Sequence, residues 1–397
     1  MNTFSLVRGL LGALMLLVLS WTPAAAQNSR AELIAEEQAE KAREVAPEEA
    51  GRLERAILRI MSSPLLDGGG GLYPWLGSVF PGSGLAGGVG YLARYPEGMR
   101  LNATAGASIN GSYRLEGSFL GPRFASRTLR PRVGASWVDA KQVSFYGLGP
   151  FADDTARARY DYSPKSVTTE LVFTPTSWFR IDGGFEWLTF ATNSGSEAPA
   201  PILFSGPGFG DDLRYQISRG TVAFDTRTSP GYSTRGSLLR ATHELYDERR
   251  DLPFDYRQTE FEAIQLVPIL HEQFVLAFRG LATLTHADGD DDVPLPLLPY
   301  IGGGSTVRGL SNRRFADRNR MVLTAEYRWL PSRALDMAVF VDAGEVVPTH
   351  DNFRIQDFET AVGIGMRIHG PTFTALRIEG AKSSRGFVLV FAAGPAF

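Results

Sequence analysis

The segment MVLTAEYRW, at residues 321–329, alternates between apolar and polar or charged side chains, and it follows a glycine-rich loop, YIGGGSTVRGL, at residues 300–310. In a β-strand, side chains two positions apart point to the same face of the sheet. One face would therefore carry Leu323, Ala325, Tyr327 and Trp329, and the other Thr324, Glu326 and Arg328. An apolar face opposite a charged one, repeated along the chain, is typical of a membrane β-barrel with a polar lumen.

The same alternation recurs from residue 85 to the end of the chain and predicts sixteen strands. Their approximate ranges are 85–95, 99–109, 111–120, 128–138, 155–163, 165–174, 178–190, 213–224, 236–246, 254–267, 272–285, 320–330, 335–342, 358–368, 372–380 and 386–396. An even number of antiparallel strands is usual in bacterial barrels formed by one chain. We therefore predict an all-β fold, with a sixteen-stranded antiparallel transmembrane β-barrel over residues 72–397.

The lengths of the connections support this count. Connections after even-numbered strands include short ones, such as 331–334, whereas those after odd-numbered strands include long ones, such as 191–212 and 286–319. Outer-membrane barrels have short periplasmic turns and longer external loops. We therefore expect the two kinds of connection at opposite ends of the barrel.

The N-terminal region predicts export. Arg8 precedes an apolar run at residues 10–19, and the small residues at 24–26 follow, which is the pattern of a secretory signal peptide over residues 1–26. The apolar run is too short to cross a bilayer as a helix. Residues 27–71 predict a short helical periplasmic segment and a glycine linker. That segment is either a solvated periplasmic tail or a helix that plugs the lumen or docks beneath the barrel.

Composition narrows the class of protein further. The chain has 43 glycines, 25 Phe, 13 Tyr and 6 Trp, which suits strands, turns and interfacial aromatic girdles. With no cysteine there is no lipoprotein anchor, and a net charge of -3 argues against binding of nucleic acid. We predict localisation in the outer membrane of a Gram-negative cell, in contact with lipid and lipopolysaccharide.

Catalysis finds little support in the sequence. The five histidines are dispersed, and none has a nucleophile and a carboxylate at recognisable spacing. An acidic run at residues 288–292 suits hard cations, but it lacks the spacing of a defined calcium loop, and a solvated loop tip is the preferred interpretation. We therefore predict no enzymatic activity, no cofactor and no metal site.

The loop at residues 300–310 carries the most specific candidate site. Its triple glycine, Gly302, Gly303 and Gly304, allows a tight turn that would direct the Arg308 side chain. If the loop turns into the lumen, the guanidinium needs carboxylate partners. Glu326 and Asp342 are inward-facing candidates on the next two strands. The alternative is a flexible external loop with Arg308 in solvent.

Four motifs, in order along the chain, resemble the barrel of the BamA/TamA-type outer-membrane assembly factors, also called the bacterial surface antigen family. They are DTRTSPGYSTRGS at 225–237, VRGL at 307–310, AEYR at 325–328 and FVDAG at 340–344. The resemblance implies sixteen strands and an external loop folded into the lumen. It also implies that Arg308, with Gly309 beside it, is held by Glu326 and Asp342. Three residues would lie at a periplasmic turn: Asp225, Arg227 and Gly236.

The resemblance also draws attention to the seam between the first and last predicted strands. In this family the seam is thought to open sideways and to pair with an incoming strand. Glycine weakens a strand and proline removes a hydrogen-bond donor, so we expect weak closure here. The residues concerned are Gly87, Gly88 and Gly90 in the first strand, and Gly394, Pro395 and Phe397 at the end. The alternative is that terminal strands of any barrel pair imperfectly.

The chain departs from the family before the barrel. Members that assemble or secrete proteins carry periplasmic polypeptide-transport-associated domains, each a compact α/β unit. Residues 27–70 are too few for one and indicate helix without strands. We therefore expect a variant without these domains, and a periplasmic partner could supply their function in trans.

These features predict a function as well as a fold. We expect the barrel to assist insertion or transport of a protein, such as an unfolded outer-membrane protein, or of a lipid. The route would be the lateral seam or the loop-plugged lumen. The alternative is a passive channel or a structural surface-antigen barrel without assembly activity.

Overall fold

The computed structural model describes residues 70–126, 128–150, 152, 156–195, 200–270 and 272–397. The predicted signal peptide and helical segment lie outside the described residues, as does all but the end of the glycine linker. In the part of the chain that is described, no helix has the length and apolar character needed to cross a membrane.

One antiparallel sheet of seventeen strands dominates the structure. Its strands are β1 (Gly71–Gly77), β2 (Ala86–Arg94), β3 (Arg100–Ser108), β4 (Tyr113–Leu120), β5 (Leu129–Phe145), β6 (Ala158–Tyr162), β7 (Lys165–Thr176), β8 (Phe179–Asn193), β9 (Asp212–Asp225), β10 (Gly236–Glu248), β11 (Tyr256–Ile269), β12 (Phe274–Ala287), β15 (Asn319–Trp329), β16 (Leu335–Val347), β17 (Glu359–His369), β18 (Thr374–Ser383) and β19 (Gly386–Ala392). The antiparallel all-β prediction is confirmed.

Shorter elements lie in the connections of the described chain. Strands β13 (Tyr300–Ile301) and β14 (Phe315–Ala316) form a separate pair. The 3-10 segments are η1 (Pro96–Gly98), η2 (Pro201–Ser205), η3 (Leu295–Leu297), η4 (His350–Asn352) and η5 (Ile355–Asp357).

Strands β6 and β7 lie end to end in a single position of the sheet. Both pair with β5 and with β8, each over a different part of those longer strands. Pro164 separates them, and proline cannot donate to a ladder. The seventeen strands therefore occupy sixteen adjacent positions. The sequence predicted sixteen strands by counting β6 and β7 separately and by missing β1.

These two errors change which end of the sheet was predicted for some of the turns. Because β1 precedes the first predicted strand, each connection between β2 and β6 lies at the end of the sheet opposite to the predicted one. From β7 onward the predicted ends are unchanged, because β6 and β7 were counted as two strands but occupy one position, which cancels the shift caused by β1. The connections after β9, β15 and β17 therefore share the end at which short turns were predicted.

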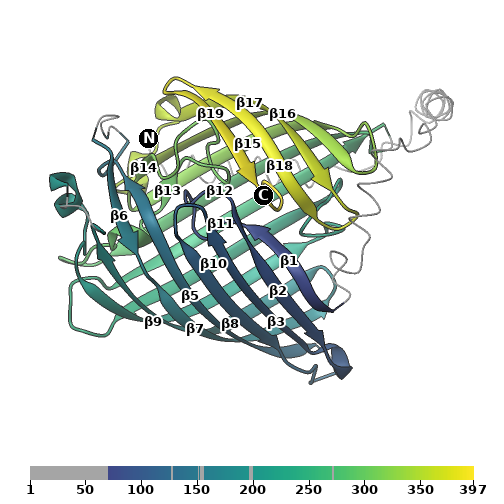
Figure 1. The fold of residues 1–397 in the computed structure, drawn as a ribbon, viewed down its shortest axis with the longest axis horizontal. Coiled ribbons are helices and arrows are strands. Elements are labelled where there is room, and N and C mark those ends of the chain that lie inside the picture. Colours follow the sequence, from purple (N-terminus) through teal and green to yellow (C-terminus); the bar gives the residue numbers. More distant parts are fainter. Residues whose placement is uncertain (1–69, 127, 151, 153–155, 196–199, 271) are drawn as a thin grey trace. The chain divides into compact units, whose positions relative to one another are not determined.

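Strands β1 and β19 form the edges of the paired sheet. The residue-by-residue registers of the described chain join β1 only to β2, and β19 only to β18. Figure 1 draws both edge strands, β1 in dark blue and β19 in yellow, on the near side of the sheet. The predicted seam is wrong in one respect, because Gly87, Gly88 and Gly90 lie in β2, which has a partner on each side.

The end of the chain also differs from the prediction. Strand β19 ends at Ala392, and Gly394 adopts a left-handed conformation, with φ 82°, that turns the backbone out of the strand. Gly394 and Pro395 therefore lie beyond the strand. The ring of Phe397 lies 5.1 Å from the guanidinium carbon of Arg328 and 5.9 Å from that of Arg279, whereas Phe387, Leu389 and Phe391 of β19 are exposed on the outer face.

The two faces of the sheet differ as the alternation predicts. In β16, Met337, Val339 and Val341 are exposed, whereas Asp336 and Asp342 are fully buried. The polar face is the inner one, because connecting loops that are far apart in the sequence meet one another on that side of the sheet. Examples are the backbone bridges between Leu148 and Ala316 and between Gly231 and Phe373.

Candidate functional site: a loop held inside the sheet

Residues 302–314, here called the lumen loop, lie on the inner face of the sheet between β13 and β14. Apolar residues from the loop and its flanking strands pack against side chains of β12, β15, β16 and β17. This cluster consists of Leu281, Ile301, Val307, Leu310, Phe315, Val322, Val346 and Ala361. The burial of these side chains attaches the loop to the inner wall.

Two glycines set the path of the lumen loop. Gly302 and Gly303 have φ angles of 109° and 97°, in the left-handed region that glycine adopts without strain. A Cβ at Gly302 would lie 2.1 Å from the carbonyl oxygen of Ser311, so the backbone passes too close for any side chain. Gly304 has no such φ, but a Cβ there would lie 2.8 Å from a methyl carbon of Val390.

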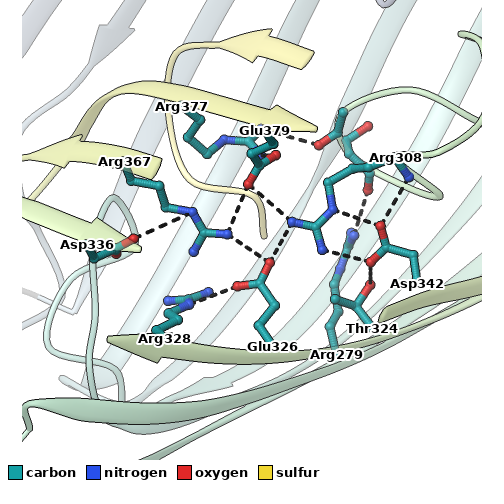
Figure 2. Close-up of polar contacts among 12 residues, drawn as sticks. Arg279, Arg308, Thr324, Glu326, Arg328, Asp336, Asp342, Arg367, Arg377 and Glu379 are labelled. Carbon is teal, nitrogen blue, oxygen red and sulfur yellow. Dashed lines mark hydrogen bonds and ion pairs between the residues drawn. The ribbon is translucent and has the colours of Figure 1, made fainter. Parts of the chain in front are cut away.

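The Arg308 side chain lies in the centre of the site and is 2% exposed. Its Nε and Nη2 donate to Asp342 Oδ2 and Oδ1 at 2.7 and 2.8 Å, and its Nη1 donates to Glu326 Oε1 at 2.7 Å. Figure 2 shows the guanidinium between these carboxylates and that of Glu379, whose Oε1 lies 3.2 Å from Nη1. The structure therefore brings together the three residues that the sequence singled out, and it adds a fourth.

The carboxylates extend the site into a larger ionic network. Glu326 also accepts from Arg328 Nε at 2.9 Å and from Arg367 Nη2 at 2.8 Å. Glu379 accepts from the same Arg367 atom at 3.0 Å and from Arg377 Nη1 at 2.6 Å. We call these seven residues the arginine–carboxylate cluster: Arg308, Glu326, Arg328, Asp342, Arg367, Arg377 and Glu379.

The electrostatics of the cluster favour the charged form of Arg308. Every member is less than 9% exposed, and a buried charge is tolerated only when it is paired and hydrogen-bonded. Burial opposes the charge on Arg308, but its hydrogen bond to Asp342 and the three surrounding carboxylates raise its pKa. The Phe340 ring adds a cation–π contact, with its centroid 3.3 Å from the guanidinium carbon.

The wall also holds the backbone of the lumen loop. Ser383 Oγ donates to the carbonyl oxygen of Gly309 at 2.8 Å, and Arg279 Nη1 donates to that of Ser305 at 2.7 Å. Arg377 Nη2 donates to the carbonyl oxygen of Gly304 at 3.3 Å. Side chains from β12 and β18 therefore hold the loop at three points beside Arg308.

Sequence reasoning missed Arg367, Arg377 and Glu379 as members of this site. Their inward position follows from the same two-residue alternation that identified Glu326, so the signal was present in the predicted strands 358–368 and 372–380. What the sequence lacks is the convergence of β15, β17 and β18 on the Arg367 guanidinium, which contacts both Glu326 and Glu379. Only the strand registers and the curvature of the sheet bring these three strands together.

The predicted periplasmic turn forms a second structural unit. Arg227 donates from its Nε and Nη2 to the two carboxylate oxygens of Asp225, at 3.0 Å each. Gly236 has φ 102°, and a Cβ there would lie 2.6 Å from the carbonyl oxygen of Thr226. Between these residues, the turn reaches the connection between β17 and β18, where Ser229 Oγ donates to the carbonyl oxygen of Thr372 at 2.7 Å.

The site offers no evident place for a metal. Its carboxylates are neutralised by guanidinium groups, and in the described ranges no set of three or more His, Cys, Asp or Glu side chains has the geometry of a metal site. The arrangement is suited to holding a loop in place, because bidentate arginine–carboxylate contacts are strong and directional.

Comparison with known proteins identifies the relatives of this chain. Residues 97–385 match the model of the Omp85 superfamily domain. BamA from Haemophilus ducreyi lacking POTRA domains 1-3 is similar in structure, with a TM-score of 0.60, 15% identity, and coverage of 82% of this chain and 69% of that chain. CdiB from Acinetobacter baumannii gives a TM-score of 0.52 at 13% identity, covering 81% of this chain and 58% of that chain.

CdiB from Escherichia coli gives a TM-score of 0.54 at 12% identity, covering 81% of this chain and 60% of that chain. The present chain thus covers less than two thirds of either CdiB chain, and no curated protein matches it. At such identities the likeness shows the fold. Because the family match spans well over half of its length, the chain belongs to the Omp85 superfamily of outer-membrane β-barrel proteins.

Proposed function

We propose that this chain is an outer-membrane barrel that assists insertion or translocation of an unfolded outer-membrane protein. The observation that carries the proposal is the pair of sheet edges, β1 and β19, each with a single partner strand in the registers of the described residues. An unpaired edge presents backbone N–H and C=O groups to an extended segment, which can add to the sheet as a new strand.

The contents of the interior favour passage at the edges over passage through the lumen. The lumen loop lies against four strands, and the turn at residues 226–235 reaches the connection between β17 and β18. Towards the end with the long loops, a third set of side chains packs into an apolar cluster that includes Leu203, Leu213 and Leu295, each 0% exposed. These contacts support a filled lumen and weigh against the rival function, a passive channel.

We propose an outer-membrane location from two features, the apolar outer face of the sheet and the signal-like N-terminal residues. Large apolar side chains are exposed along the outer face, which suits contact with membrane lipid and the acyl part of lipopolysaccharide. The signal-like residues 1–26 support export across the inner membrane. A periplasmic partner acting in trans would bring the client, and no step requires an enzymatic reaction or a cofactor.

Reconstitution tests this function directly. The full chain is placed in liposomes of bacterial outer-membrane lipids, and a small unfolded outer-membrane barrel is added as the client. We expect client folding, followed by its heat-modifiable migration on gels, to be faster than in liposomes without the protein. Equal folding rates with and without the protein would disprove assembly activity.

A further inference from the structure

Strand β1 is held by two aromatic side chains that occupy space left by glycines. Tyr73 and Trp75 point to the inner face, while Leu72 and Leu76, 69% and 60% exposed, point outward. β1 has seven residues and contains Pro74, which cannot donate to a ladder. This length is below the ~9–11 residues of a membrane-spanning strand, and with one partner and a proline β1 is weakly held by backbone hydrogen bonds alone.

The Tyr73 ring fills the space above Gly90, its direct partner in β2. A Cβ at Gly90 would lie 2.1 Å from Tyr73 Cζ, a distance that real side chains do not allow. The Tyr73 hydroxyl continues past β2 and donates to Asn102 Oδ1 in β3 at 2.7 Å. This ring therefore fits a position that requires glycine, and its polar end has a specific partner.

The Trp75 ring occupies a second space, above Gly106 of β3. A Cβ at Gly106 would lie 2.2 Å from Trp75 Cζ3, and a Cβ at Gly77 would lie 2.7 Å from Cζ2 on the other side of the ring. The same ring packs against the apolar cluster that fills one end of the interior. Of the glycines that suggested a weak seam in the sequence, Gly90 thus makes room for an aromatic side chain.

We propose that the inner face of β2 and β3 is an acceptor surface for an extended strand with aromatic residues two positions apart, and that β1 is its resident, exchangeable occupant. The surface consists of Gly90, Asn102 and Gly106. Release of β1 would open it to a polypeptide segment with the same spacing of aromatic residues. Naming a client polypeptide as the second occupant rests on the proposed function, whereas the fit of β1 does not.

The glycines provide matched variants for a test. Gly90→Ala and Gly106→Ala would drive a Cβ into the aromatic rings, whereas Gly87→Ala and Gly117→Ala would place it in open space. None of these four glycines has a positive φ, so the pairs differ in what a Cβ would meet: an aromatic ring of β1 on the inner face in the first pair, and open space on the outer face in the second. The double variant Tyr73→Ala/Gly90→Ala removes the clash again.

Retention of β1 can be measured by disulfide formation. The chain has no cysteine, and Leu72 and Tyr91 face each other on the outer side of β1 and β2. In a Leu72→Cys/Tyr91→Cys background, overpacking by Gly90→Ala or Gly106→Ala should slow crosslinking roughly tenfold. Gly87→Ala and Gly117→Ala should leave the rate unchanged, and Tyr73→Ala/Gly90→Ala should restore it. Heat-modifiable migration reports that the rest of the sheet is folded.

The acceptor surface can be tested with a labelled peptide of sequence GLYPWLG, added to the full chain in detergent. The Tyr73→Ala/Trp75→Ala variant should bind it roughly tenfold more tightly than the unaltered protein, and a peptide with alanine at both aromatic positions should not bind. Equal crosslinking in all four glycine variants, a crosslink that joins two copies, or binding independent of the aromatic residues would overturn the proposal. These assays need no client, so their failure is distinct from failure of the proposed function.

Discussion

Arg308 and Asp342 make a three-point contact between the lumen loop and the wall. Besides the two side-chain hydrogen bonds at 2.7 and 2.8 Å, the backbone N–H of Arg308 donates to Asp342 Oδ2 at 3.1 Å. Thr324 Oγ1 donates to the other carboxylate oxygen at 3.0 Å. One aspartate thus fixes both the backbone and the side chain of the loop arginine, and its own position is fixed by a neighbouring strand.

Arg308→Ala should destabilise the folded barrel by on the order of 3–5 kcal/mol, because it leaves the buried Asp342 carboxylate without its guanidinium and removes one partner each of Glu326 and Glu379. The temperature at which the folded form loses its faster gel migration should fall accordingly. Arg257→Ala is the matched control: Arg257 lies 3.6 Å from Asp288 in an exposed pair, which contributes about 0–1 kcal/mol. Equal effects of the two substitutions would contradict a buried ionic contact at Arg308.

Arg308→Lys should recover little of that stability. A lysine ammonium cannot make the two parallel hydrogen bonds to Asp342 while also reaching Glu326. We expect a melting temperature closer to that of Arg308→Ala than to that of the unaltered protein. Full recovery by lysine would show that charge alone, without the planar geometry, holds the loop.

The cluster should behave as one unit under mutation. Glu326 contacts Arg308, Arg328 and Arg367, so Glu326→Gln weakens interactions that Arg308→Ala also removes. The double variant should therefore be less destabilised than the sum of the single variants, by about 0.5–3 kcal/mol. Chemical unfolding of the four proteins measures this coupling, and strict additivity would exclude a shared network.

The backbone at Gly302 offers a test of the loop path itself. Gly302→Ala adds a Cβ 2.1 Å from a carbonyl oxygen at a position with positive φ, so the loop must move. Gly289 also has a positive φ, at 62°, but a Cβ there meets nothing within 4 Å. A cysteine at Val307, which is 0% exposed, should react faster with a water-soluble thiol reagent in Gly302→Ala than in Gly289→Ala. Equal reactivity would place the loop elsewhere.

Conductance in planar bilayers distinguishes the filled lumen from a passive channel. The unaltered protein should show no steady large conductance, because the lumen loop, the turn at 226–235 and the apolar cluster occupy the interior. Release of the loop by Arg308→Ala should produce larger, fluctuating currents. A stable open pore in the unaltered protein would support the channel function instead.

Alternation of side chains predicted much of this architecture. It placed Glu326 and Asp342 inward on successive strands, and the glycines before Arg308 indicated a loop able to direct it. The sequence could not predict β1, because GLYPWLG is short and rich in glycine and proline and is indistinguishable from a linker until its aromatic rings meet Gly90 and Gly106. Nor could it predict the turn at Gly394, since the alternation continues to Phe397.

Crosslinking of the two edges is the most direct test of the central claim. Cysteines placed at outward positions of β1 and β19, such as Leu76 and Leu389, can be joined by bifunctional reagents of increasing length in reconstituted protein. We predict that joining the edges abolishes stimulation of client folding and that reduction of a cleavable reagent restores it. Undiminished stimulation by a fully crosslinked protein would contradict entry of the client at these edges.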